Sequence, residues 1–178
     1  MGAAINAEAE LKMADMFDIC HGGGLDLCAL GLAEIDFQGN VNVSKFHGRV
    51  TGPGGFIDLA QHTKKLVLMG TFAAGQLREH CEDGKLVIDH EGKYKKFKKE
   101  IEQVTFSGTY AAAQKQQVLV VTERAVFRLT EKGLMLTEIA PGMDLEKDIL
   151  AQMEFRPLIA EGLKQMDGRI FLPEPMGM

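Results

Sequence analysis

The sequence predicts an α/β fold, and three of its stretches carry that prediction. Residues 64–72, KKLVLMGTF, form a near-continuous apolar run that ends in a glycine, which is typical of a strand buried on both faces of a sheet. Residues 117–139 contain apolar runs separated by short turns, as expected of strands in meander order. Residues 57–65 read as a short helix directly before a strand. Helices interleaved with such strands define the α/β class.

Chain length and composition indicate one ordinary globular domain. The chain has 178 residues, of which 46% are hydrophobic and 25% charged, so it is long enough to bury a core of its own. We assign residues 1–172 to this domain. Residues 173–178, which include Pro173 and Pro175, are expected to form a loose tail.

Charge and hydropathy exclude several classes of protein. A net charge of −5 argues against a general nucleic-acid binder. No apolar run reaches the roughly 18 residues that span a bilayer, so no membrane association is expected. The first residues resemble no signal peptide. An odd number of cysteines without metal-ligand spacing suits reduced thiols, and this predicts a cytoplasmic protein.

The first half of the chain alternates between candidate helices and strands. Composition predicts a helix over Ala3–Met16, and alternation predicts strands over Phe17–Cys20, Leu25–Asp36 and Val41–Ser44. A helix is expected over Ile57–Lys65, followed by a buried strand over Leu66–Met69.

The second half begins with a charged, exposed hairpin. Its expected strands are Lys85–Asp89 and Tyr94–Lys99, which flank the turn His90–Lys93. Strands are then expected over residues 117–122, 125–130 and 134–139. Asp144 is a good N-cap for a helix over Leu145–Met153.

The stretch Gly52-Pro53-Gly54-Gly55 is the strongest local signal. A bare glycine turn that opens a helix offers unpaired N–H groups to an oxygen-bearing ligand, since the first helical amides lack internal partners. Glycine turns before helices are also common structural devices, so the residues alone leave both interpretations open.

Other polar residues give weaker signals. The five histidines show no metal-ligand grouping, and no metal site is predicted. Glu123 and Arg124 follow a buried strand at its carboxyl end, where α/β sheets place ligand groups, but an ion pair in a strand-to-strand turn is the preferred interpretation. Asn42 stands in a polar strand edge with no distinguishing context of its own.

Motifs along nearly the whole chain resemble the carboxyl-terminal half of a family I CoA-transferase. The similarity is greatest to single-chain bacterial propionate and acetate (acetoacetate) CoA-transferases. The resembling stretches are Gly2–Ala9, Gly22–Asp36, Gly39–Phe46, Gly52–Lys65, Gly70–Gly75, Val121–Thr130 and Glu138–Pro157. The resemblance implies an open mixed β-sheet with flanking helices.

The resemblance also implies a ping-pong transfer of CoA from a short-chain acyl-CoA to a short-chain carboxylic acid. In that family a glutamate attacks the acyl-CoA and becomes a glutamyl-CoA thioester. Carried over by motif, the Gly54 backbone N–H is an oxyanion donor, Gly55 keeps the loop bare, and Asn42 contacts the bound CoA or acyl group. CoA is expected as a substrate, with no permanently bound cofactor and a homo-oligomeric assembly.

One departure from the family pattern shapes the prediction. The E-S-G or E-x-G motif that carries the nucleophile does not occur before Gly2, and Glu8, Glu10 and Glu34 lie outside such a context. The chain is therefore expected to be inactive alone and to need an amino-terminal half or a partner subunit that supplies the glutamate. The alternatives are a non-catalytic remnant or interaction module of the same fold and, more distantly, a sugar-phosphate isomerase-like enzyme.

Overall fold

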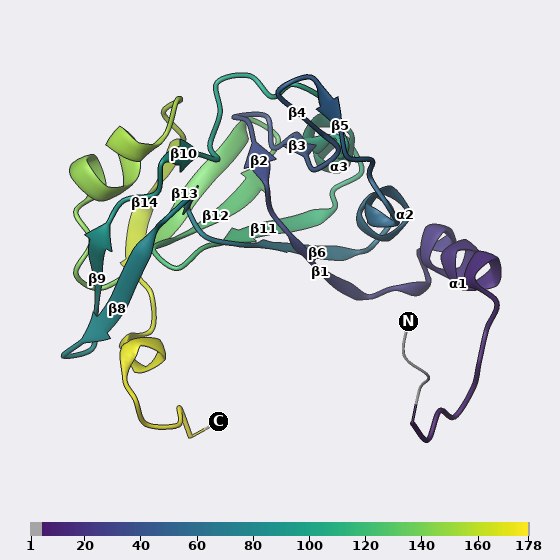
Figure 1. The fold of residues 1–178 in the computed structure, drawn as a ribbon, viewed down its shortest axis with the longest axis horizontal. Coiled ribbons are helices and arrows are strands. Elements are labelled where there is room, and N and C mark those ends of the chain that lie inside the picture. The colour runs from purple at the N-terminus through teal and green to yellow at the C-terminus, as the bar shows by residue number, and fades with distance from the viewer. Residues whose placement is uncertain (1–4, 178) are drawn as a thin grey trace.

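The molecule is built on one six-stranded sheet in the order β1-β6-β11-β12-β13-β14 (Figure 1). The computed structural model describes residues 5–177. The strands are β1 (Leu27–Gly31), β6 (Lys65–Met69), β11 (Gln117–Val121), β12 (Ala125–Thr130), β13 (Gly133–Ile139) and β14 (Leu158–Gln165). β1, β6 and β11 are parallel, β12 and β13 are antiparallel to their predecessors, and β14 pairs in parallel with β13. The sheet is therefore mixed and open, and the predicted α/β class is confirmed.

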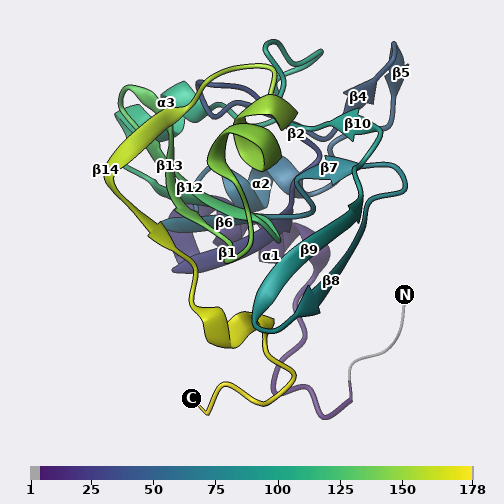
Figure 2. The same ribbon diagram turned by 90° about the vertical axis from the view of Figure 1, so that its left-hand side faces the viewer.

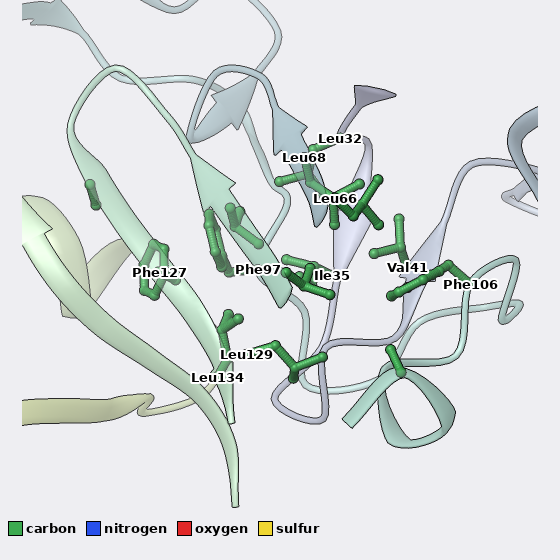
Figure 3. Close-up of a cluster of buried hydrophobic side chains, with 14 of the residues drawn as sticks. Leu32, Ile35, Val41, Leu66, Leu68, Phe97, Phe106, Phe127, Leu129 and Leu134 are labelled. Atoms are coloured by element: carbon green, nitrogen blue, oxygen red, sulfur yellow. The ribbon is translucent and has the colours of Figure 1, made fainter. Parts of the chain in front are cut away.

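One face of this sheet forms the hydrophobic core. Apolar residues alternate along the strands, so Leu66 and Leu68 of β6 point to the same side as Val118 and Val120 of β11. Phe127 of β12 joins them, and Phe97 stacks between it and Phe72, with ring centroids 4.9 Å and 4.4 Å away. Figure 3 shows Leu66, Leu68, Phe97 and Phe127 in one cluster with Ile35, Val41 and Phe106 from the opposite layer.

The opposite layer consists of short ribbons and two small helices that lie above β6 and β11 in Figure 1. α2 (Phe56–Ala60) and α3 (Gly108–Ala113) each bury residues in the core. The ribbons are β2 (Glu34–Ile35) with β3 (Val41–Asn42), β4 (Lys45–Phe46) with β5 (Arg49–Val50), and β7 (Ala73–Ala74) with β10 (Tyr94–Lys95). A fourth pair, β8 (Arg78–Glu82) with β9 (Lys85–His90), projects from the body of the molecule (Figures 1 and 2).

The amino-terminal predictions need correction. The helix expected over Ala3–Met16 begins only at Met13, as α1 (Met13–Ile19); Ala3 lies outside the described residues. The strand expected over Phe17–Cys20 is wrong, because α1 continues into a π-helical turn, η1 (Cys20–Gly24). The alternation in Phe17–Cys20 covers only four residues and does not outweigh the helical hydrogen bonds formed with residues on both sides.

The predicted hairpin pairs differently from expectation. Lys85–Asp89 is a strand, but its partner is β8, whereas Tyr94 and Lys95 pair with β7. The tight turn is Asp83-Gly84, and both residues have positive φ angles, 51° and 71°. An Asp-Gly turn is the stronger hairpin signal.

The later strands are confirmed, while the last helix is irregular. Asp144 caps it by accepting a hydrogen bond from the Lys147 N–H, as predicted, but the segment divides into a π-helical turn, η2 (Leu145–Ile149), and a 3₁₀ turn, η3 (Leu150–Gln152). α3 and β14 were not predicted. A last 3₁₀ turn, η4 (Gly168–Phe171), precedes residues 172–177, which contain no helix or strand. Among residues 5–177, no helix is long and apolar enough to cross a membrane.

Candidate oxyanion site

The glycine loop Gly52–Gly55 lies directly before α2. Gly52 and Gly54 have φ angles of 83° and 55°, in the left-handed region that L side chains avoid. The Phe56 N–H donates to the Pro53 carbonyl oxygen at 3.1 Å, which closes the turn. Gly54 is exposed, and a β-carbon built on it would meet no atom within 4 Å. Within the described part of the chain, its N–H donates no hydrogen bond, so it is free to face a ligand oxygen.

The loop is fastened to the strand segment before it. The Ser44 carbonyl oxygen accepts hydrogen bonds from the N–H groups of Thr51 and Gly52, at 2.9 Å and 3.1 Å. The Ser44 hydroxyl lies 2.7 Å from the Thr105 hydroxyl, and both residues are buried. The entry of the loop is therefore held by hydrogen bonds to the buried Ser44. We call Ser44 the anchor of the loop, because it accepts these hydrogen bonds.

Asn42 is bonded to the backbone of this anchor and is fully buried. Its amide nitrogen donates to Glu34 Oε2 at 2.7 Å and to the Lys45 carbonyl oxygen at 2.6 Å. Its Oδ1 accepts from the N–H groups of Ser44 and Lys45, both at 3.1 Å. Both donors and the acceptor are used inside the protein, so this geometry makes Asn42 a support for the Ser44 anchor. Direct contact between Asn42 and CoA stays a prediction.

Gly55 brings α1 to the loop. A β-carbon at Gly55 would lie 2.7 Å from two atoms of the Phe17 ring, closer than real β-carbons approach. The absence of a side chain at Gly55 is thus what allows Phe17 to lie against the loop. The sequence did not indicate this neighbour, and the expectation that Gly55 leaves room for bound CoA stays a prediction.

Two histidines meet beside the same helix. The His21 and His62 rings have centroids 4.2 Å apart, and His21 Nδ1 lies 3.8 Å from Asp58 Oδ1 in α2. No sequence pattern indicates this proximity, because the two histidines are far apart in the chain. Among the described residues, no group of three or more histidine, cysteine, aspartate or glutamate side chains could hold a metal ion.

Glu123 and Arg124 form a separate, buried ion-pair cluster. Arg124 is fully buried, and its Nε donates to Glu123 Oε1 at 2.7 Å while Nη1 donates to Glu91 Oε2 at 2.7 Å. Glu123 Oε2 accepts the Phe72 N–H at 2.7 Å, and the guanidinium carbon lies 5.0 Å from the centroid of the Phe72 ring. The interpretation of an ion pair in a strand-to-strand turn agrees with this geometry, since each charge is matched within the protein.

The cluster shifts the pKa values of its members. Burial opposes ionisation of Glu91, but hydrogen bonds from Arg124 and the Gly92 N–H outweigh it, so the pKa of Glu91 lies below its ordinary value. Burial likewise opposes the charge of Arg124, and the two carboxylates raise its pKa in spite of that. Nearby, burial lowers the pKa of Lys96, whose ammonium group donates to the Leu32 carbonyl oxygen and the Thr71 hydroxyl.

Known CoA-transferases match the chain over almost its full length. The acetate CoA-transferase YdiF of Escherichia coli K12 is 51% identical over 176 residues, which are 99% of this chain and 33% of that protein. The caffeate CoA-transferase of Acetobacterium woodii is also 51% identical, over 96% of this chain and 33% of its own length. The acetate CoA-transferase subunit beta of Haemophilus influenzae is 34% identical over 84% of this chain and 57% of the subunit. No model of a protein family matches the sequence.

Solved structures give the same result. The crystal structure of YdiF from E. coli O157:H7 as a thioester complex with CoA has a TM-score of 0.96 and 50% identity, and covers 100% of this chain and 35% of that one. The decarboxylase AibA/AibB, at 20% identity and a TM-score of 0.66, shares the fold. The chain spans about one third of the length of the first two relatives. It belongs to the CoA-transferase family, and it corresponds to a portion of the longer members.

Proposed function

We propose that this chain is the portion of an acyl-CoA:carboxylate CoA-transferase that supplies an oxyanion donor and part of the acyl and CoA pocket. The observation that carries the proposal is the exposed Gly54 N–H, which has a positive φ and no internal hydrogen-bond partner in the described part of the chain. The identity to the acetate and caffeate CoA-transferases supports the same assignment.

The chemistry proceeds through carbonyl addition. A glutamate carboxylate attacks the thioester carbon of the acyl-CoA, and the carbonyl oxygen becomes an oxyanion. Collapse expels CoA thiolate and leaves an acyl-glutamyl anhydride. The thiolate then attacks the glutamyl carbonyl and releases the first carboxylate, which gives glutamyl-CoA, and a second carboxylic acid takes up the CoA by the reverse steps. A fixed N–H donor at Gly54 stabilises each oxyanion without reorganisation during the step.

The nucleophilic glutamate comes, in this proposal, from outside the chain. Glu34 is unsuited to the role because Asn42 already donates to its carboxylate at 2.7 Å. Glu8 and Glu10 are exposed and lie outside the family motif. An amino-terminal half or a partner subunit would therefore supply the nucleophile, and the chain alone would be inactive. The naming of two matched relatives as subunit beta supports a partner.

Three further features remain predictions. The substrates would be a short-chain acyl-CoA and a short-chain carboxylate, by analogy with acetate CoA-transferase. Asn42 would support the CoA site through the Ser44 anchor, whether or not it touches CoA. The complete enzyme would be a cytoplasmic homo-oligomer, and the free state of Cys20, Cys28 and Cys81 supports a reducing compartment.

The test is reconstitution of CoA transfer. The chain is assayed with acetyl-CoA and acetoacetate, alone and after co-expression with the stretch of E. coli K12 YdiF outside the matched 176 residues. Transfer is expected only in the co-expressed sample. Gly54→Val keeps the backbone N–H but displaces it, because a β-branched residue resists the positive φ at this position. Turnover should then fall by about 10²-fold, the loss typical of one oxyanion donor.

A matched control separates displacement of the Gly54 N–H from the effect of equal backbone strain elsewhere in the chain. Gly48 also has a positive φ, 74°, and a β-carbon there would also meet no atom within 4 Å. Gly48→Val therefore introduces similar strain outside the loop and should keep most of the activity. If the co-expressed sample transfers no CoA, or if Gly54→Val matches the unmodified chain, the non-catalytic remnant is the correct interpretation.

A further inference from the structure

Within residues 5–177, the second face of the sheet is largely apolar and carries no layer of helices or strands over β1, β6 and β11. Side chains alternate across a sheet, so the residues between the core positions of β1, β6 and β11 point away from the core. In Figure 1 the second layer lies above β6 and β11, and no helix or strand is drawn beneath them. We call this surface the open face and define it by the residues Leu27, Ala29, Gly31, Val67, Met69, Leu119 and Val121.

The strand register gathers these residues into a continuous patch. Ala29 pairs with Val67, which pairs with Leu119, so the three stand side by side on adjacent parallel strands. The next row is Gly31, Met69 and Val121. Leu27 is 59% exposed and Met69 47% exposed, which is a large exposure for apolar residues within strands of a parallel sheet.

Polar groups border the patch rather than interrupt it. Lys65 and Gln117 stand in the row of Leu27, at the beginning of the strands, and Arg128 pairs with Leu119 from β12. A β-carbon built on Gly31 would meet no atom within 4 Å, so the backbone there is open to close approach. An apolar centre with a polar rim is the composition of a protein interface.

Parallel strands specify what covers such a face. Their crossover connections place helices on both sides of the sheet, and sheets of this kind are buried on both faces. Along the described chain, the connections between β1, β6 and β11 cover one side only. The strand β1 is also the outer strand of the sheet and pairs on one side, with β6.

From these observations we infer that the open face is the docking surface for a helical layer from the remainder of the CoA-transferase. The inference rests on the proposed function and names the surface through which the nucleophile-bearing portion attaches. The remaining two thirds of the E. coli acetate CoA-transferase provide ample chain for such a layer. The YdiF structure contains this fold at a TM-score of 0.96 within a chain of which the match covers 35%. A second copy of this chain is the competing occupant.

The first test is a footprint of the unmodified chain. The chain is oxidised by hydroxyl radicals alone and in the complex obtained by co-expression with the YdiF stretch described above, and labelling is read at each residue. The inference expects labelling of Leu27 and Met69 to fall several-fold in the complex. Leu172, which is 46% exposed and lies off the open face, should be labelled equally in both samples.

The second test compares two leucine variants in the same complex. Leu27→Lys places a charge on the open face, whereas Leu172→Lys places one elsewhere on the surface. Leu27→Lys should weaken the association by about tenfold or more, and Leu172→Lys should leave it unchanged. Circular dichroism of each variant checks that the chain is folded. The hydroxyl-radical footprint of the unmodified chain tests the docking surface without relying on either variant.

Each other outcome overturns the inference in a recognisable way. A complex that transfers CoA but leaves the open face fully labelled refutes the docking surface and keeps the proposed function. Protection of the open face in the chain alone, at concentrations where it sediments as a dimer, identifies a second copy as the occupant. A sample in which neither complex nor transfer appears refutes the proposed function and the inference together.

Discussion

Phe17 lies against Gly55 so closely that a single methyl group at position 55 would collide with its ring, at 2.7 Å from two ring atoms. This contact joins α1 to the glycine loop, and none of the side chains of α1 is buried. Gly55→Ala should therefore release α1 rather than unfold the domain. We expect faster amide hydrogen exchange over residues 13–19, with a loss of unfolding free energy below about 1 kcal/mol because Phe17 is only partly buried.

A double variant tests whether the two residues act through one contact. Phe17→Ala should raise exchange in α1 as Gly55→Ala does, and the combination should add nothing to either change. Gly22→Ala is the control, since a β-carbon there would meet no atom within 4 Å. Additive effects of Phe17→Ala and Gly55→Ala would show that α1 is attached by another contact.

The position of the Gly54 N–H depends on a left-handed backbone, and this predicts an order of activities. Asparagine adopts positive φ more readily than other residues with a side chain, whereas β-branched valine resists it. Since a side chain at position 54 meets no neighbour, only the backbone preference should matter. In the reconstituted transferase, turnover should decrease from the unmodified chain to Gly54→Asn and then to Gly54→Val. Equal losses in both variants would contradict a role for the backbone angle.

The buried Asn42 side chain predicts a loss of stability that does not involve CoA. Asn42→Ala leaves the Glu34 carboxylate without its amide donor and the N–H groups of Ser44 and Lys45 without their acceptor. Leaving such buried groups unpaired should lower the free energy of unfolding by at least about 2 kcal/mol. Urea denaturation of the chain without CoA measures this loss.

Glu34→Gln provides the matched control for Asn42. The amide keeps one oxygen that can accept from Asn42 Nδ2, so the free energy of unfolding should change by less than about 1 kcal/mol. If Asn42→Ala proves as stable as the unmodified chain and loses only CoA affinity, Asn42 acts on the ligand directly and the support role is wrong.

The sequence predicted the sheet better than it predicted the segments around it. The runs that became β6, β11 and β12 are mainly apolar and have residues buried in alternation, so local pattern and tertiary burial favour the same structure. The segment Phe17–Cys20 offered a single alternation and became helical. β14 was missed because it carries polar residues through Glu161 and Lys164, which conceal its pairing with β13.

For the candidate site, the glycine loop could be predicted from the sequence, but the residues that contact and hold the loop could not. The glycines of Gly52–Gly55 signal their backbone angles directly, because only glycine adopts them at low cost. The anchor at Ser44, the ring of Phe17 and the meeting of His21 with His62 depend on which segments the fold brings together. Those distances come from tertiary packing, and no local pattern encodes them.

The buried Arg124 predicts the largest effect of a single substitution. Arg124→Met removes the cation from Glu91 and Glu123 while keeping an apolar side chain over Phe72. Breaking a buried ion pair by removing one partner costs about 3–5 kcal/mol, because the remaining charges lose their compensation. We expect a loss of this size at neutral pH in urea denaturation. A loss below about 1 kcal/mol would mean that water or rearrangement compensates the carboxylates.

The same network predicts how the loss depends on pH. In the unmodified chain the folded-state pKa of Glu91 lies below its ordinary value of 4.5, so its stabilising contribution is present above that value and disappears as the pH falls through the folded-state pKa. In Arg124→Met, Glu91 keeps the hydrogen bond from the Gly92 N–H but loses the cation, so burial, the largest influence on it, raises its pKa above that in the unmodified chain. Acid then protonates the unpaired carboxylate and relieves part of the destabilisation. The difference in unfolding free energy between the two proteins should therefore narrow between about pH 7 and about pH 4. Glu91→Gln in the Arg124→Met background removes the titrating group, so the difference in unfolding free energy should depend much less on pH. If the pH dependence is undiminished, another carboxylate is responsible for it.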